Sequence, residues 1–275
     1  MSRPKYSRLL IPRKAKDDRV VGVLALYGPL GLLEEGRDLV ACFREADRAR
    51  QASGALLSSG VPVELVTDIS EEDPFERLRA VSRPFPVGRR LWIDPGDPSD
   101  SQPPSGRVAL RLPASRAFGT GEHESTRLLL EALEEESLGG LAVLDVGTGS
   151  GVLALAAVAL GAETAVALDA DPEAVFVARE NLRRHPFGPS VLLVAARVDA
   201  IGRNFDLVLA NLLPEEFLPE RRNVLSRVAA GGRLLLSGIP RGRESGLLER
   251  LRSKRWRLAS RRAAGQWGCV CLERT

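Results

Sequence analysis

Short, wholly apolar runs alternate with helical segments from residue 140 onward, and this alternation restricts the possible folds more than any other feature. The apolar runs lie at residues 141–146, 165–168, 191–195 and 205–210, and helical spacing separates them at residues 152–160 and 172–184. Strands that are apolar on both faces belong to parallel sheets covered by helices on both sides. The pattern therefore predicts an α/β fold with a doubly wound, Rossmann-like sheet, whose ligands bind beyond the carboxyl ends of the strands.

The first of these strands leads into a glycine-rich loop, Leu-Asp-Val-Gly-Thr-Gly-Ser-Gly, at residues 144–151. Gly147, Gly149 and Gly151 permit positive φ and let a ligand approach the backbone without a Cβ clash. The helix that follows is expected to direct free backbone N–H groups at the ligand. Dinucleotide-binding loops have the spacing G-x-G-x-x-G, whereas this loop has G-x-G-x-G. The spacing disfavours a nicotinamide dehydrogenase and fits the methionine-binding loop of S-adenosylmethionine enzymes; a purely structural turn is the alternative.

Polar residues follow two further strands of the predicted sheet. Asp169 comes directly after the second strand, where a carboxylate can accept hydrogen bonds from both hydroxyls of a ribose. Asp171 precedes Pro172 and is interpreted as a helix N-cap. Asn211 ends the fourth strand, where its amide oxygen can accept from a substrate amine. We therefore assign Asp169 to the cofactor and Asn211 to catalysis, with a capping Asp and a plain turn Asn as the structural alternatives.

A second glycine-containing segment, residues 118–126, precedes the first strand of this sheet. Its first part is predicted to be a flexible loop, and its end leads into a helix that reaches about residue 133. His123 in this segment either contacts the substrate or has a structural role, and the sequence leaves both open. His185, beside Pro186, is expected at the surface without a partner.

The N-terminal region has a different order of elements. Strand-like runs at residues 6–11, 31–35, 37–43 and 61–67 and helical runs at residues 17–26 and 46–58 give the order β-α-β-β-α-β. This order predicts a small ferredoxin-like α+β domain at residues 1–70. Residues 71–112, with many prolines and one expected strand at residues 89–93, are interpreted as a connector, and residues 113–275 as the Rossmann-like domain.

Charge and cysteine content exclude several classes of protein. The formal net charge is +3, and the basic residues are scattered among acidic ones, so direct binding of nucleic acid is not expected. Cys42, Cys269 and Cys271 are too few for a disulfide framework, and we interpret the last two as buried thiols rather than metal ligands. No apolar run can cross a bilayer, and no export signal follows Met1. We expect a cytoplasmic monomer without a metal site.

Several motifs occur in the order seen in the ribosomal protein L11 methyltransferases (PrmA), which this chain resembles. They lie at residues 117–126, 147–151, 168–172, 211–213 and 231–239, and residues 84–93 resemble the interdomain segment of that family. The resemblance implies that Thr126, Gly147, Asp169 and Asn211 contact S-adenosylmethionine, and we add Phe118 to these candidates. It also implies that the N-terminal domain recognises a ribosomal protein.

The chain departs from the family pattern in three places. Residues 114–116, Ala-Ser-Arg, stand where the family has Pro-Gly, and Ser125 replaces the first of two threonines. Pro74 and Leu78 stand where the connector of the family has tryptophans. These departures concern recognition of the protein substrate more than binding of the cofactor.

The predicted reaction is the transfer of methyl groups from S-adenosylmethionine to amino groups of a protein, either lysine side chains or the N-terminal amine. A large-subunit ribosomal protein is the expected substrate. The alternatives are another protein, a nucleic acid, or a non-catalytic module that binds S-adenosylmethionine. Base methylation favours an aromatic residue after Asn211 to stack on a flipped base, and Leu212 and Leu213 offer none.

Overall fold

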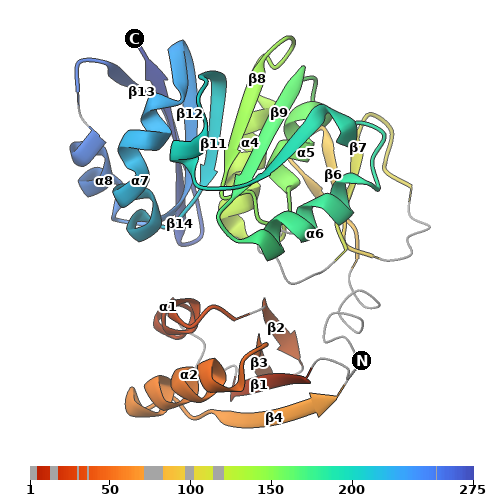
Figure 1. The fold of residues 1–275 in the computed structure, drawn as a ribbon, viewed down its shortest axis with the longest axis vertical. Coiled ribbons are helices and arrows are strands. Elements are labelled where there is room, and N and C mark those ends of the chain that lie inside the picture. Colours follow the sequence, from red (N-terminus) through yellow and green to blue (C-terminus); the bar gives the residue numbers. More distant parts are fainter. Residues whose placement is uncertain are drawn as a thin grey trace. The chain divides into compact units, whose positions relative to one another are not determined.

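A computed structural model describes residues 5–12, 18–29, 31–35, 37–70, 83–96, 102–113, 121–251 and 253–275 (Figure 1). The chain divides into two compact units, and the boundary lies between residues 70 and 83 of the described chain. Each unit is described by itself. No helix in the described ranges is both long enough and apolar enough to cross a membrane.

The N-terminal unit has the predicted β-α-β-β-α-β order. Its elements are β1 (Lys5–Pro12), α1 (Asp18–Leu26), β2 (Gly31–Glu35), β3 (Asp38–Phe43), α2 (Ala46–Ser58) and β4 (Glu64–Ser70). The strands form an antiparallel sheet in the order β2-β3-β1-β4. This is the split βαβ arrangement, so the predicted ferredoxin-like domain is confirmed.

Both helices of this unit pack on one face of its sheet (Figure 1). Alternate residues of a strand point to the same face. The alternating positions Leu9 and Ile11 of β1 are therefore buried together, and Leu24 of α1 and Leu56 of α2 join the same cluster. This cluster is the hydrophobic core of the N-terminal unit.

The larger unit is built on a seven-stranded sheet in the order β10-β9-β8-β11-β12-β14-β13. Its strands are β8 (Ala142–Val146), β9 (Thr164–Asp169), β10 (Val191–Ala195), β11 (Phe205–Asn211), β12 (Val228–Pro240), β13 (Trp256–Ala264) and β14 (Trp267–Arg274). The first five strands in this order, β10, β9, β8, β11 and β12, are parallel to one another. β14 pairs antiparallel with β12 and with β13. The doubly wound, Rossmann-like sheet predicted from the apolar runs is therefore confirmed.

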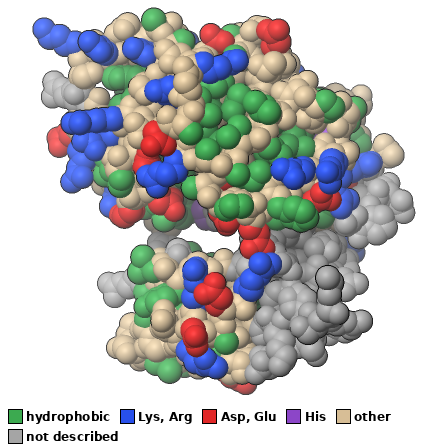
Figure 2. Space-filling model, in the orientation of Figure 1, with side chains coloured by type: hydrophobic (Ala, Val, Ile, Leu, Met, Phe, Trp, Pro, Cys, Tyr) green, Lys and Arg blue, Asp and Glu red, His purple; other side chains and the backbone are tan. Residues whose placement is uncertain are grey.

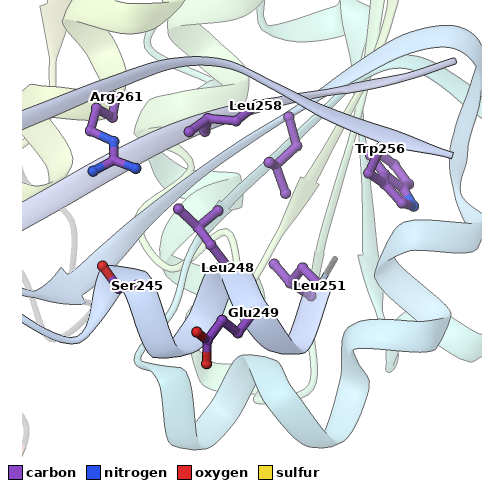
Figure 3. A pocket seen from close by; sticks show the side chains of 8 residues that line it. Ser245, Leu248, Glu249, Leu251, Trp256, Leu258 and Arg261 are labelled. Carbon is purple, nitrogen blue, oxygen red and sulfur yellow. The ribbon is translucent and has the colours of Figure 1, made fainter. Parts of the chain in front are cut away.

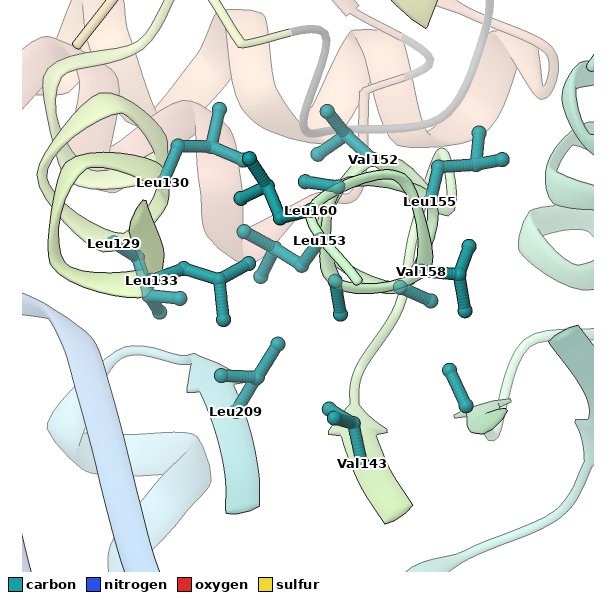
Figure 4. Packing of buried hydrophobic residues seen from close by; sticks show 14 of the residues in the cluster. Leu129, Leu130, Leu133, Val143, Val152, Leu153, Leu155, Val158, Leu160 and Leu209 are labelled. Atoms are coloured by element: carbon teal, nitrogen blue, oxygen red, sulfur yellow. The ribbon is translucent and has the colours of Figure 1, made fainter. Parts of the chain in front are cut away.

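Helices cover this sheet on both faces, as the apolar strands require. The helices are α4 (Glu124–Glu134), α5 (Val152–Ala159), α6 (Pro172–Leu182), α7 (Pro214–Ser226) and α8 (Glu244–Leu251), with short 3-10 turns at Gly188–Ser190 and Val198–Ala200. Neighbouring residues of β8 point to opposite faces: Val143 packs in the cluster formed with α4 and α5, whereas Leu144 packs in the cluster formed with α7 and α8. Figure 4 shows α4 and α5 above Val143 and Leu209. The apolar helix predicted at residues 152–160 is α5, which is buried along almost its whole length.

Residues 83–113 belong to the larger unit and form a small sheet of their own. Its strands are β5 (Phe85–Val87), β6 (Leu91–Asp94) and β7 (Val108–Arg111), in the order β5-β6-β7. β6 corresponds to the strand expected at residues 89–93, whereas β5 and β7 were not predicted. Leu91, Ile93 and Leu110 are fully buried in the same core as α4 and α5. Residues 71–82 of the predicted connector lie outside the described residues.

The Glu134 carboxylate at the end of α4 binds the turn between β5 and β6. Its oxygens accept hydrogen bonds from the N–H groups of Arg89 (2.7 Å), Arg90 (2.9 Å) and Leu91 (3.0 Å). Gly88 in this turn has φ +54°, and a Cβ atom there would lie 2.2 Å from Glu134 Oε2. The turn therefore requires glycine, and the carboxylate fixes the small sheet on α4.

Candidate active site

The glycine loop, Asp169 and Asn211 follow three neighbouring strands at the carboxyl edge of the large sheet. β8 lies between β9 and β11, with Val146 opposite Leu168 on one side and Ala210 on the other. All three strands are parallel, so their carboxyl ends meet at one edge. The structure thus brings together groups that lie up to 64 residues apart in the sequence.

The glycine loop needs glycine for both conformation and space. The φ angles of Gly147, Gly149 and Gly151 are +72°, +53° and +84°. A Cβ atom on Gly147 would lie 2.8 Å from Cδ2 of Leu212, and one on Gly151 would lie 3.3 Å from Cβ of Ala178. The loop can therefore approach both the Asn211 loop and α6 only because side chains are missing.

Hydrogen bonds inside the protein hold this loop in place. The N–H groups of Gly147 (3.0 Å) and Thr148 (2.9 Å) both donate to the carbonyl of Leu168, and the N–H of Gly149 donates to Asp169 Oδ2 (3.0 Å). Both acceptor residues lie at the carboxyl end of β9. The end of β9 therefore fixes the position of the loop that follows β8.

At the first turn of α5, two N–H groups that were expected to be free have partners within the protein. The Val152 N–H donates to Ser150 Oγ (3.3 Å), and the Ala154 N–H donates to Asp145 Oδ2 (3.2 Å). The prediction that the helix directs these donors at a ligand is therefore wrong for Val152 and Ala154. The side-chain oxygens of Ser150 and Asp145 take the place of a ligand as acceptors for these two donors.

Asp145 is the buried carboxylate beneath the loop. Its Oδ2 also accepts from the Thr148 hydroxyl (2.6 Å), whereas its Oδ1 is buried without a hydrogen-bond partner in the described chain. Burial raises the pKa of Asp145 from 3.8 to about 7, against the opposing effect of the hydrogen bonds from Thr148 and Ala154, and the nearby Asp169 raises it further. Asp145 is therefore an internal carboxylate that holds Thr148 and the first turn of α5.

Asp171 caps α6, as predicted, whereas Asp169 accepts hydrogen bonds from two backbone N–H groups. Asp169 Oδ1 accepts from the N–H of Asp171 (3.0 Å) and its Oδ2 from Gly149, while Asp171 Oδ1 accepts from the N–H of Glu173 and caps α6. An ionised carboxylate has about four lone-pair positions. Asp169 thus retains two for the hydroxyls of a ribose, and it is partly exposed at the strand end.

Asn211 at the end of β11 forms a hydrogen bond with the first turn of α4. Its Nδ2 donates to the hydroxyl of Thr126 at 3.0 Å, although 85 residues separate them. Thr126 is fully buried, whereas Asn211 is partly exposed. The bond occupies the amide nitrogen and leaves the amide oxygen of Asn211 as an acceptor for a ligand.

His123 is held by structural contacts at the start of α4. Its Nδ1 accepts from the N–H of Ser125 (3.3 Å) as the N-cap of α4 and lies 2.8 Å from Ser125 Oγ. Its ring packs edge-on against Trp267, with centroids 4.9 Å apart. Burial lowers the pKa of His123, although Glu124 opposes this shift. Phe118, the remaining cofactor-binding candidate, lies outside the described residues.

Asn181 and His185 both have partners that the sequence does not predict. The buried Asn181 of α6 donates from Nδ2 to the carbonyl of Ser150 (2.8 Å) in the glycine loop. His185 is 7% exposed, lies 3.1 Å from the carbonyl of Arg111 through Nε2 and stacks on Phe187. The expectation that His185 is a surface residue without a partner is therefore wrong. No local pattern marks either residue, because their partners are 31 and 74 residues away.

A pocket of about 330 Å³ lies away from the strand ends. It opens between α8 and the strands β13 and β14 (Figure 3), and it is lined by Ser245, Leu248, Glu249, Leu251, Trp256, Leu258, Arg261 and Leu272. None of these residues belongs to the glycine loop or to the ends of β8, β9 and β11. We therefore place the site at the strand ends.

The surface charges are less evenly spread than the whole sequence suggests. Residues 241–275 contain ten Lys and Arg residues and three acidic residues. Figure 2 shows basic side chains gathered at the edge that carries α8 and β13. Several of them are paired, for example Arg257 with Glu273 and Arg262 with Glu135. The predicted scatter of basic and acidic residues therefore holds only in part.

The cysteines of β14 are buried in the core. Burial raises the pKa of Cys269 to about 12 and that of Cys271 to about 11. Both are therefore buried, neutral thiols at physiological pH, as predicted, and Cys269 also forms a hydrogen bond with Ser237. No group of side chains in the described ranges has the arrangement of a metal site.

Comparison with known proteins identifies the family. A family model described as ribosomal protein L11 methyltransferase (PrmA) matches residues 31–275. The chain belongs to this family. It is accordingly an S-adenosylmethionine-dependent protein methyltransferase, of the family that acts on ribosomal protein L11.

Individual PrmA relatives agree with this assignment. The ribosomal protein L11 methyltransferase of Geobacter metallireducens is 43% identical over 209 residues, which cover 76% of this chain and 68% of that protein. The one of Geotalea daltonii is 38% identical over 268 residues, covering 94% and 83%. The crystal structure of a ribosomal protein L11 methylase from Lactobacillus delbrueckii is 29% identical, with a TM-score of 0.64, and the match covers 70% of this chain and 99% of that one.

The site fits the cofactor of the PrmA family. Gly147, without a side chain, lets Leu212 pack directly on the loop, and Asp169 retains two acceptor positions for hydroxyl groups. Asp169 presents a partly exposed carboxylate at the strand end, which suits a ligand that carries positive charge.

Proposed function

We propose that this enzyme methylates amino groups of ribosomal protein L11, at lysine side chains or at the N-terminal amine. The observation that supports this most directly is the Asn211–Thr126 hydrogen bond, which leaves an amide oxygen as acceptor at the strand ends. A neutral amine needs such an acceptor to direct its lone pair at an electrophile. The proposed roles are Asn211 for the amine, Asp169 for the ribose, and Thr126, Gly147, Gly149 and Gly151 around the cofactor.

In this mechanism the protein orients the two reactants and provides a suitable electrostatic environment. S-adenosylmethionine, when bound, supplies a methyl group activated by a sulfonium centre. The Asn211 amide oxygen accepts a hydrogen bond from an N–H of the amine, and this contact orients the lone pair of the amine nitrogen toward the methyl donor. Leu212 covers the glycine loop and helps to exclude water, because its Cδ2 lies only 2.8 Å from where a Cβ of Gly147 would be.

The amine must lose a proton before it attacks. Removal from water disfavours an ammonium group, so the pKa of the substrate amine falls as it enters the site. His123 is engaged as the cap of α4 and by Trp267, so the mechanism assigns it no proton transfer. Proton loss to water before attack suffices.

Radiolabelled methyl transfer tests this function. Purified enzyme and labelled S-adenosylmethionine are incubated with ribosomal proteins and ribosomal RNA from cells that lack the enzyme. We expect label in L11. Label in another protein or in RNA would identify a different substrate, and no label despite cofactor binding would indicate a non-catalytic module. The basic edge at α8 and β13 is the feature that favours RNA as the second candidate.

Binding of the cofactor is tested at Asp169. The loss of two ribose hydrogen bonds costs about 1–3 kcal/mol, so Asp169→Ala should weaken S-adenosylmethionine binding by about fivefold to 150-fold in calorimetry. Asp171→Asn is the matched control, because it keeps an N-cap oxygen for Glu173 and should leave the affinity within about twofold. Unchanged affinity in Asp169→Ala would remove this residue from the site.

The remaining features of the proposal concern partners and location. The ferredoxin-like domain, residues 1–70, recognises the ribosomal protein, and residues 113–275 carry the chemistry. The enzyme acts as a monomer in the cytoplasm, where ribosomal proteins are made. Phe118 contributes to the cofactor site. Light scattering of the purified protein measures its molar mass and so tests whether it is a monomer. Calorimetry on Phe118→Ala measures whether the loss of this side chain weakens S-adenosylmethionine binding.

A further inference from the structure

Ser237 of β12 is a buried polar residue that the proposed function does not use. Its side chain is fully buried, and its hydroxyl lies 2.8 Å from the carbonyl of Ser125 and 3.3 Å from that of Gly268. The Cys269 thiol is also a hydrogen-bond partner of this hydroxyl. A hydroxyl donates one hydrogen bond, and the shorter of the two carbonyl contacts is the one to Ser125. Ser237 therefore holds the first turn of α4 against the large sheet, across 112 residues of sequence.

The residue that follows Ser125 is Thr126, whose hydroxyl holds Asn211. A hydrogen bond that fixes the carbonyl of Ser125 also fixes the backbone from which the Thr126 side chain projects. The chain of contacts thus runs from the Ser237 hydroxyl through the backbone of α4 to the Thr126 hydroxyl and on to the Asn211 amide at 3.0 Å. The amide nitrogen is occupied at the end of this chain.

The backbone of β12 also holds the loop that contains Asn211. Ser237 lies opposite Asn211 in the pairing of β12 with β11, and its carbonyl accepts from the N–H of Leu212 at 3.1 Å. Gly238 has φ +82°, and a Cβ atom there would lie 2.6 Å from the carbonyl oxygen of Leu212. β12 therefore holds both sides of the Thr126–Asn211 pair, one through a side chain and the other through its backbone.

We propose that Ser237 is a positioning residue for methyl transfer. It sets the distance between α4 and β11, so that Thr126 binds the amide nitrogen of Asn211 and the amide oxygen faces the substrate amine. This inference rests on the proposed function. A substrate that donates hydrogen bonds, such as a neutral amine, meets an acceptor in this arrangement, whereas a rotated amide would offer it a donor.

A double-mutant cycle on cofactor affinity tests the coupling without a protein substrate. S-adenosylmethionine binding is measured by calorimetry for Ser237→Ala, Thr126→Val and the double variant, at a temperature where all three are folded. Each single change should weaken binding by about threefold to tenfold, because it displaces or alters Thr126, which the proposed function places beside the cofactor. The double variant should be no weaker than the weaker single variant, because both changes break one chain of contacts. The proposal would be overturned if the double variant lost affinity by the product of the two single losses, or if either single variant kept the wild-type affinity.

The kinetic readout separates positioning from stability. With L11 as substrate, Ser237→Ala should lower kcat while KM for L11 stays within about twofold. Ser237→Cys, which keeps the shape and a weaker donor, should fall between Ser237→Ala and the wild type. Ser226→Ala is the matched control, since it removes a hydroxyl that donates to a backbone carbonyl (2.7 Å) in α7, and it should leave kcat unchanged.

The outcomes distinguish this inference from the proposed function. A lower melting temperature for Ser237→Ala with unchanged kcat would make Ser237 merely structural and overturn the inference. Failure of the wild-type enzyme to label L11 would instead contradict the proposed substrate. The cofactor-binding cycle would still decide the role of Ser237 in that case.

Discussion

Replacement of Asp145 by asparagine should stabilise the larger unit at high pH and not at low pH. The carboxyl group has a pKa of about 7 in the folded protein, against an ordinary value of 3.8, mainly because it is buried. Below pH 3.8 the group is protonated in both the folded and the unfolded state, so its ionisation does not change the free energy of unfolding. As pH rises from 3.8 to 7, the unfolded state ionises first, so the folded state loses stability with each pH unit.

The magnitude follows from the two pKa values. A difference of about three units, at 1.36 kcal/mol each, makes the ionisable group cost about 4 kcal/mol above pH 7. The amide introduced by Asp145→Asn would stay neutral at every pH, and its oxygen could still accept from Thr148 and Ala154, as Asp145 Oδ2 does. The stability gained from the substitution should therefore grow by about 4 kcal/mol between pH 4 and pH 8, or about 10 °C in melting temperature for a unit of this size.

Thermal unfolding of the cofactor-free protein across that pH range measures the effect. Asp206 provides the control: it is exposed and accepts from the N–H of Ala142 (2.8 Å), and Asp206→Asn should not give the same gain. An equal change in melting temperature at pH 5 and pH 8 would show that ionisation of Asp145 does not destabilise the folded protein. Such a result would mean that water or a cation reaches the buried carboxylate.

Three further changes test the packing of the larger unit by thermal unfolding. Glu134→Ala removes the acceptor of three backbone N–H groups and should cost about 2 kcal/mol, with a smaller loss for Glu134→Gln, which keeps one oxygen. Gly151→Ala forces φ +84° on a residue with a side chain and should cost about 1–2 kcal/mol; an unchanged melting temperature would show that the loop relaxes. Burial lowers the pKa of His185, so the folded state resists its protonation and loses stability as pH falls below 6.5. His185→Gln should reduce this loss between pH 7 and pH 5, and an identical pH dependence would contradict it.

Local patterns in the sequence were sufficient for the elements that carry the site. The strand predicted at residues 141–146 and the helix at residues 152–160 match β8 and α5 within a residue or two, because a continuous apolar run and a glycine turn are strong local signals. Parallel strands then place Asp169 and Asn211 beside the loop without any further information.

Other features depend on contacts that no local pattern marks. β5 and β7 are short and lie among prolines, and their burial comes from α4 and α5, which follow later in the chain. Glu134 reads as an ordinary charged helix residue until the turn 45 residues earlier is placed against it. The sequence likewise does not predict the contact of the Ser237 hydroxyl, because Ser125 lies 112 residues away.

The docking of residues 83–113 on α4 and α5 decides where the chain can be cut for separate expression. A fragment that begins at residue 113 would lack the strands whose Leu91, Ile93 and Leu110 fill the space beside those helices. It would leave an apolar surface and the Glu134 carboxylate uncovered, and such surfaces promote aggregation. A fragment that begins near residue 83 keeps these strands. The larger unit should therefore be expressed together with residues 83–113.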